Sequence, residues 1–525
     1  MPRIDRRTTT TPRIGAASSA SRLDQKAIRT WTATGPTPLR GRGVRDVPLP
    51  EPVAFKGVTN TQLVSALSRA DQTRHLELKA GRTRAAPLVS PEDGSTKVKA
   101  FHMAALGADQ TGIEFPMQMA HIGEAEGFRV VLRVPAGSEP EFKARLAAEK
   151  LDNVTLVPVR DSEELDFWSE DQGELHTDGS VSVPRSLQGS NTLSAEEQLR
   201  ALTAGRFERL HPRTQVDLST DAKLMAALQK HPDTAFSGVG AVGARGGQRA
   251  IAAVAVGGKK DLRVSNGYLE GGNALVGRRA GGAGYAVVGA DSVALSRAAL
   301  SKELGRSLSE GEVRKLIAQD YGVTEGELLV VEQPGDFHID MHMALLPGGK
   351  AVVNDAAAAF ALQKKWLTED LANSKPTPLP AGASAAVRAR YDNAKALWDI
   401  SKEVLPRDLE TLERSARSAS ENEARMVRDL EKGGVKVERM AGIFPPSHGL
   451  ERMNFLNLEQ GQNPKGEHFM VALGGDARAE KMVAEKLAAA TGKPVRVHFL
   501  SRNLTATTLN AGGGISCRTK VEAAR

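Results

Sequence analysis

The most informative stretch of the sequence is Ala511-Gly512-Gly513-Gly514-Ile515-Ser516-Cys517-Arg518-Thr519. Cys517 is the only cysteine among 525 residues, so it cannot form a disulfide within its own chain. Cysteines that only fill a core usually lie inside apolar runs. This one follows three glycines, which let a backbone turn sharply and approach a ligand closely. We therefore predict that Cys517 is a reactive nucleophile; a buried structural thiol is the alternative.

The composition bounds the class of protein. Apolar residues make up 40% of the chain, enough for a sizeable core, and its length predicts a catalytic body with tails or insertions. A single cysteine excludes intramolecular disulfides and cysteine-rich metal sites, which fits a reducing compartment. We predict no cofactor and no metal.

The positive charge is concentrated at the N-terminal end. The net charge is +7, yet the first 100 residues alone carry 18 Lys and Arg against 8 Asp and Glu. Aromatic residues for base stacking are not interleaved with these cations, so we predict no nucleic-acid partner. No apolar run reaches the length of a membrane span, and Met1–Arg22 has no apolar signal-peptide core. We expect a cytoplasmic protein without a membrane partner.

Short apolar segments alternate with helical patterns from about residue 97 onward. We predict strands at Arg129–Val134, Val154–Val159, Ala250–Val256, Ala286–Val288, Leu328–Val331, Met343–Leu346, Val435–Met440, His468–Leu473 and Val495–Leu500. We predict helices at Ser138–Lys150, Ala195–Leu202, Asp221–Lys230, Ser307–Tyr321 and Asp476–Thr491. This alternation is typical of an α/β body built from repeated units.

Four segments follow from the composition along the chain. Residues 1–95 form a basic, largely disordered leader with a short helix near Gln62–Leu78. Residues 96–355 and 437–525 form the two parts of the α/β body. Residues 356–436 form a helical insertion, with long charged helices at Ala385–Val404 and Asp408–Gly433 on either side of Pro406.

Two motifs place carboxylates beside glycines. Trp168 leads into Glu170-Asp171-Gln172-Gly173, and Glu270 precedes Gly271-Gly272-Asn273 and an apolar run. Each motif is also compatible with an ordinary polar turn on the surface.

The stretch Asp336-Phe337-His338-Ile339-Asp340-Met341-His342 alternates polar and apolar residues. In a strand, His338, Asp340 and His342 would share one face, which is either exposed or lines a site. A metal site of these three residues is the alternative. The glycine pattern at Gly238–Gly243 would suit a dinucleotide only between a strand and a helix, and we predict a strand at Arg249–Val256 after it.

Four of these motifs occur in the same order as in a known family of enzymes. Trp-x-x-Asp-x-Gly, Glu-Gly-Gly-Asn, His-x-Asp and a final Gly-Gly-Gly-Ile-x-Cys resemble the guanidino-group-modifying enzymes of the pentein superfamily, such as the agmatine, arginine and peptidylarginine deiminases. The resemblance covers roughly Lys97–Arg525. It implies an α/β fold, a five-bladed pseudo-symmetric propeller of ββαβ-type units around a central pocket.

The resemblance also implies roles for five residues. Asp171 and Asp340 would bind a substrate guanidinium, Cys517 would attack its carbon, His338 would transfer protons, and Glu270 would orient His338. The pKa of the thiol would be lowered by the bound cation and by protonated His338. The implied reaction converts the guanidino group to a ureido group and ammonia through a covalent thiouronium intermediate.

The sequence departs from agmatine deiminases at two neighbours of these residues. Glu170 stands where they usually have arginine, and Ser516 stands where they usually have histidine. The substrate therefore stays open among agmatine, arginine, methylated arginines and protein arginine. An amidinotransferase, a non-catalytic pentein-like binding module and a homo-oligomeric assembly stay open as well.

Overall fold

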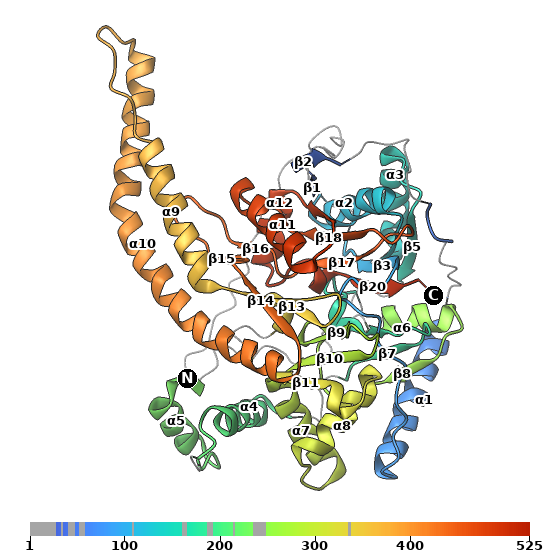
Figure 1. The fold of residues 1–525 in the computed structure, drawn as a ribbon. Helices are drawn as coiled ribbons and strands as arrows, with labels where there is room; N and C mark the ends of the chain where they lie inside the picture. Colours follow the sequence, from blue (N-terminus) through green and yellow to red (C-terminus); the bar gives the residue numbers. More distant parts are fainter. Residues whose placement is uncertain are drawn as a thin grey trace.

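The computed structural model describes residues 28–32, 35–39, 48–51, 58–107, 110–159, 165–185, 193–213, 216–234, 248–333 and 338–524. They form a mixed α/β body of several small sheets with helices around them, as predicted (Figure 1). The glycine pattern at residues 238–243 and the segment Met1–Arg22 lie outside the described residues.

Five of the sheets share one connectivity. In each, two antiparallel strands are followed by a helical crossover to a third strand that runs parallel to the second. Parallel neighbours require such a crossover because their ends lie at opposite edges. The strands, sheet by sheet, are β20 (Lys520–Ala523), β3 (Val98–Ala104), β4 (Arg129–Pro135) and β5 (Val154–Val159); β6 (Glu174–Leu175), β7 (Val181–Val183) and β8 (Leu262–Val264); β9 (Ala274–Arg278), β10 (Gly284–Gly289) and β11 (Leu328–Val331); β12 (Met343–Leu346), β13 (Lys350–Asn354) and β14 (Lys436–Met440); β17 (Glu459–Gln462), β18 (His468–Ala472) and β19 (Val495–Phe499). A further pair joins β15 (Ile443–Phe444) to β16 (Met453–Asn454).

The helices cover these sheets and are bounded by recognisable caps. Ser194 with Glu197 and Ser309 with Glu312 form capping boxes, while glycines in the left-handed conformation end several helices. None of the described helices is long and apolar enough to cross a membrane. The helices of the body are α2 (Gln110–Glu126), α3 (Glu139–Glu149), α4 (Ala195–Leu210), α5 (Asp221–Lys230), α6 (Gln248–Gly257), α7 (Ala290–Leu304), α8 (Glu310–Tyr321), α11 (Ala477–Thr491) and α12 (Arg502–Asn510).

One predicted strand is wrong. The segment Ala250–Val256 lies in α6, because Ile251, Ala252 and Ala255 are buried at helical spacing against β7. The other strands and helices predicted between Arg129 and Leu500 coincide with elements of the structure within a few residues, apart from the long helices of the insertion, the strand through His338, and α4, which continues to Leu210 beyond its predicted end at Leu202.

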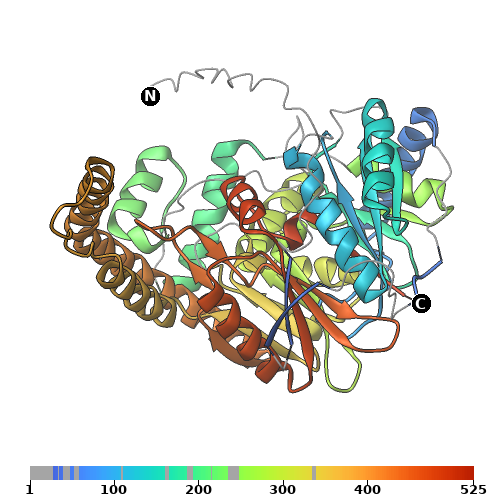
Figure 2. The same ribbon diagram turned by 90° about the horizontal axis from the view of Figure 1, so that it is seen from above.

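The predicted insertion is the crossover of the fourth sheet, between β13 and β14. It consists of α9 (Ala356–Asn373) and α10 (Ala385–Lys432), which lie side by side and project from the body as an arm (Figures 1 and 2). Trp398 Nε1 donates a hydrogen bond to the carbonyl oxygen of Leu371 at 2.9 Å across the pair. The two helices predicted on either side of Pro406 are wrong, since α10 continues through this proline.

The predicted disordered leader is wrong for the part that the structure describes. β1 (Arg29–Thr32) pairs with β19 and adds β2 (Gly35–Pro38) to the fifth sheet. Arg29 forms an ion pair with the buried Glu480, which ties this hairpin to α11. The helix predicted near Gln62–Leu78 is confirmed as α1 (Asn60–Lys79). Non-local pairing of this kind leaves no periodic signal in a short, Pro-rich segment.

Candidate active site

The five predicted site residues lie on or beside four short turns, each just before the first strand of a sheet. The turns are η4 (Glu170–Gln172) before β6, η6 (Gly271–Asn273) before β9, η8 (Ile339–Met341) before β12 and η9 (Ser516–Arg518) before β20. All five side chains are at most 4% exposed: Asp171, Glu270, His338, Asp340 and Cys517. The repeated unit thus directs the same segment of several sheets toward one buried point.

The remaining unit contributes Asn457, which stands just before β17 and which the motifs did not predict. Its Nδ2 donates to Asp340 Oδ2 at 2.7 Å and to Cys517 Sγ at 3.3 Å. Its Oδ1 accepts a hydrogen bond from the backbone N–H of Ser516 at 2.9 Å. The available signal was positional, because Asn457 is a polar residue between two leucines at the place where the other units carry their site residues.

His338 is held among carboxylates. Its Nε2 lies 2.7 Å from Glu270 Oε2 and 3.8 Å from Asp171 Oδ1. Burial by itself would lower the pKa of the imidazole, but the charge of Asp171 and the hydrogen bond to Glu270 raise this pKa to about 9. The ring is therefore an imidazolium at neutral pH, which can donate a proton.

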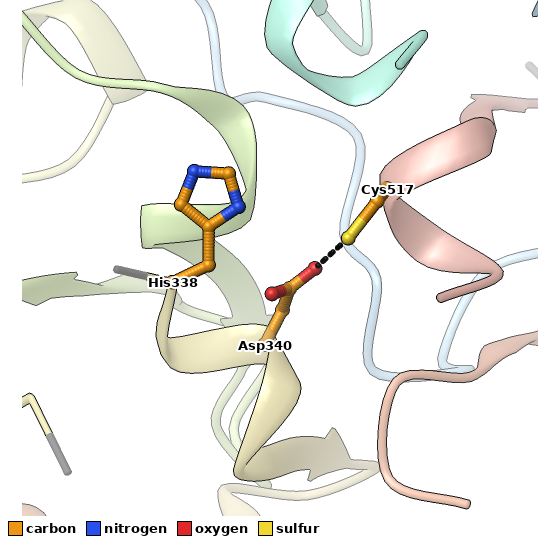
Figure 3. Close-up of side chains that lie close together, drawn as sticks. All are labelled: His338, Asp340 and Cys517. Atoms are coloured by element: carbon orange, nitrogen blue, oxygen red, sulfur yellow. Dashed lines mark hydrogen bonds between the residues drawn. The ribbon is translucent and has the colours of Figure 1, made fainter. Parts of the chain in front are cut away.

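Cys517 points from its turn toward Asp340 (Figure 3). Its Sγ lies 3.4 Å from Asp340 Oδ2, and ligand atoms of His338, Asp340 and Cys517 all lie within 4.8 Å of one another. Burial, followed by the charges of Asp340 and Glu170, holds the pKa of the thiol well above its ordinary value. The resting site therefore contains a neutral thiol, and a bound cation is needed to offset the carboxylates and favour the thiolate.

The glycines in the motifs are required by close packing. A Cβ on Gly514 would lie 2.2 Å from Asn457 Oδ1, and one on Gly513 would lie 2.3 Å from the ring of Trp168. A Cβ on Gly272 would lie 2.4 Å from His338 Nδ1. Of the final three glycines only Gly512 has a positive φ, of 98°, so a sharp turn explains only the first of them.

The predicted strand through His338, Asp340 and His342 is wrong. Residues 339–341 form the turn η8, and β12 begins only at Met343. Among the described residues, the groups that could hold a metal ion are His338, Asp340 and Cys517, and Asp171, Glu270 and His338. His342 belongs to neither group, so the structure does not bring together the predicted alternative metal triad.

Comparison with known proteins gives a similarity to solved structures only. No protein-family model matches the sequence, and no curated protein matches it significantly. A solved X-ray structure described as a "putative agmatine deiminase" aligns with 84% of this chain and 99% of its own, with a TM-score of 0.45 and 13% identity. The chemistry of the candidate site therefore has to follow from its own residues.

The raised pKa of His338 predicts a pH-dependent contribution to stability. Because the pKa is about 9 in the folded protein and 6.5 in the unfolded chain, the contribution is full below pH 6.5 and is lost as the pH rises through 9. We expect the free energy of unfolding of the wild type, relative to His338→Gln, to decrease between pH 6.5 and 9.5 in urea titrations. In Glu270→Gln the decrease should be smaller and should end at lower pH, because removal of a partner that raises the pKa of His338 lowers this pKa in the folded protein. A difference that stays constant or grows with pH would contradict this assignment.

Proposed function

We propose that the protein is a cysteine-dependent deiminase that hydrolyses a guanidino group to a ureido group and ammonia. The observation that carries the proposal is the burial of two groups of side chains that share His338. Ligand atoms of His338, Asp340 and Cys517 lie within 4.8 Å of one another, and so do those of Asp171, Glu270 and His338. The proposal includes closure of the five ββαβ units into a pentein-type propeller around this point.

The carboxylates suit a planar cation. Asp340 Oδ2 already accepts hydrogen bonds from Ser516 Oγ at 2.6 Å and from Asn457 Nδ2, whereas Oδ1 is buried and has no partner in the described part of the chain. Oδ1 is therefore available to an N–H of the substrate. Asp171 lies across the site on the side of His338 and would accept from a second N–H. Guanidinium groups favour such in-plane contacts with carboxylates.

The proposed reaction needs two additions at one carbon. When the substrate cation binds, the Cys517 thiol loses its proton to solvent and the thiolate forms an S–C bond to the guanidinium carbon, while His338 donates its proton to the departing nitrogen, which leaves as ammonia. A thiouronium remains on the sulfur. Neutral His338 then removes a proton from water, and the resulting oxygen nucleophile attacks the carbon. The C–S bond breaks as the new hydroxyl group loses its proton to solvent, which releases the ureido product and the thiolate. Glu270 keeps His338 oriented through both steps.

The substrate is tested by assaying ammonia and ureido product with agmatine, arginine, methylated arginines and an arginine-containing protein in separate reactions. Ammonia release without an amine acceptor supports the deiminase. Turnover of arginine only when an amine is added would instead assign an amidinotransferase. A protein that binds a guanidinium but turns over none of these substrates would be a binding module.

Removal of metals is expected to leave this activity unchanged. The proposed chemistry places His338, Asp340 and Cys517 on the substrate, so none of them is committed to an ion. We expect the same kcat and KM before and after dialysis against EDTA, with metal content followed by elemental analysis. Loss of activity on dialysis and its return with added zinc would assign these three residues to a metal centre instead.

A further inference from the structure

A small cavity adjoins the candidate active site. It has about 20 Å³ of free space, which is room for one water-sized group. Its wall includes Asp340 and Ser516, which also belong to the site, and three further carboxyl groups, those of Glu92, Glu170 and Glu459.

These carboxyl groups are buried with too few donors. Lys520 is 1% exposed and is the cation beside them, with its Nζ 2.9 Å from Glu92 Oε1 and 4.0 Å from Glu170 Oε1. It also pairs with Glu174 Oε2 at 2.6 Å, so one positive charge faces several carboxylates. Glu92 Oε2 and Glu170 Oε2 are both buried and have no hydrogen-bond partner within the described residues.

The shortage of positive charge is reflected in the raised pKa values of the same carboxyl groups. Burial raises the pKa of Glu459 to about 8 and that of Glu92 to about 7, even though Thr519 and Lys520 act in the opposite direction. Burial and the charge of Asp340 also raise the pKa of Glu170. A ligand that only donates hydrogen bonds, or that carries a positive charge, would stabilise the charged form of all three groups.

We propose that this cavity binds a monovalent cation of the size of ammonium or potassium. The cavity has room for one group of this size. The rest of the wall has the apolar Leu275, Met343 and Leu456 among its members, together with Gln460, whose Oε1 is also buried and has no hydrogen-bond partner within the described residues. Buried acceptors without partners, together with apolar contacts, fit a weakly hydrated monovalent ion.

The cavity shares the Asp340 wall with the place where the proposed reaction releases ammonia. Ammonium formed there is one source of the ion, and potassium from the surrounding solution is the other. Only the naming of ammonium as a reaction product rests on the proposed function. Binding itself is a property of the resting protein and can be measured without substrate.

The test is ion binding by the full chain in the absence of substrate. Calorimetric titrations and melting temperatures are measured with ammonium, potassium and tetramethylammonium chlorides at constant ionic strength. We expect saturable binding of ammonium and potassium in the millimolar range and none of tetramethylammonium, which is too large. The ratio of the ammonium and potassium affinities shows which of the two ions the cavity prefers. Equal stabilisation by tetramethylammonium, or no saturable binding, would overturn the proposal.

Variants locate the site. Glu459→Gln and Glu170→Gln should each weaken ammonium and potassium binding by about tenfold or more, since each removes a buried charge facing the ion. Glu438→Gln, at an exposed position on β14, is the matched control and should bind like the wild type.

If the buried variants fail to fold, thallium(I) bound to crystals of the wild type locates the ion instead. An anomalous peak beside Glu170 and Glu459 supports the proposal, and its absence there contradicts it. Activity enters neither measurement, so a protein that binds the ion without deiminating any substrate would refute the proposed function alone.

Discussion

Replacement of Cys517 by alanine is expected to lower kcat for ammonia release by about 10⁴-fold or more, because covalent catalysis is lost completely when its nucleophile is removed. The thiol is 4% exposed and packs in the core next to Trp168, so the smaller side chain should cost only about 1 kcal/mol of stability. Turnover, urea unfolding and near-UV circular dichroism of the variant and the wild type measure these effects.

The single cysteine makes the control unusually direct. Iodoacetamide can label only Cys517, so mass spectrometry of the wild type reports one modification and that of Cys517→Ala reports none. A substrate guanidinium should protect the wild-type thiol when it occupies the site before alkylation. Wild-type turnover in Cys517→Ala would exclude this residue as the nucleophile.

Replacement of Asp340 by asparagine should lower kcat/KM by about 10³-fold, since loss of one partner of a buried ion pair costs about 3–5 kcal/mol. The same variant should have a more reactive thiol. Asp340 is, after burial, the largest cause that raises the pKa of Cys517, so its neutralisation lowers this pKa. We therefore expect faster alkylation of Cys517 at pH 7.5 together with slower turnover.

Opposite signs in these two measurements distinguish an electrostatic role from general damage to the fold. Damage that exposes the site would accelerate alkylation but would also lower the midpoint of urea unfolding. Asp392→Asn, on the exposed face of α10, is the matched control and should change neither rate. Unchanged kcat/KM in Asp340→Asn would remove Asp340 from the substrate site.

Much of the fold could be predicted from local sequence pattern. Buried strands such as Leu328–Val331 are short apolar runs bounded by polar turns, and the length and spacing of their apolar residues are enough to predict a strand. The segment Ala250–Val256 shows where this fails, because an apolar run of seven residues suits a buried helix as well as a buried strand. The β1–β19 pairing could not be predicted, since it joins positions more than 460 residues apart.

The residues of the candidate site that lie in distinctive short motifs could be predicted from the sequence. Cys517 and His338 are rare residue types next to glycines or acids, so their patterns are distinctive. Asn457 and the carboxyl groups of Glu92 and Glu459 are common types in ordinary surroundings. Their importance arises from position in the repeated unit and from burial, which only the arrangement of the sheets supplies.

The pairing of β20 with β3 has a consequence for how the candidate site is assembled. These strands begin more than 400 residues apart in the chain, so the first sheet cannot be completed until the last strand has been synthesised. Contacts of such high sequence separation form slowly and leave an unpaired strand edge exposed in the meantime. Cys517 lies three residues before the start of β20, so a partially made chain lacks both this strand and the thiol that the proposed reaction requires.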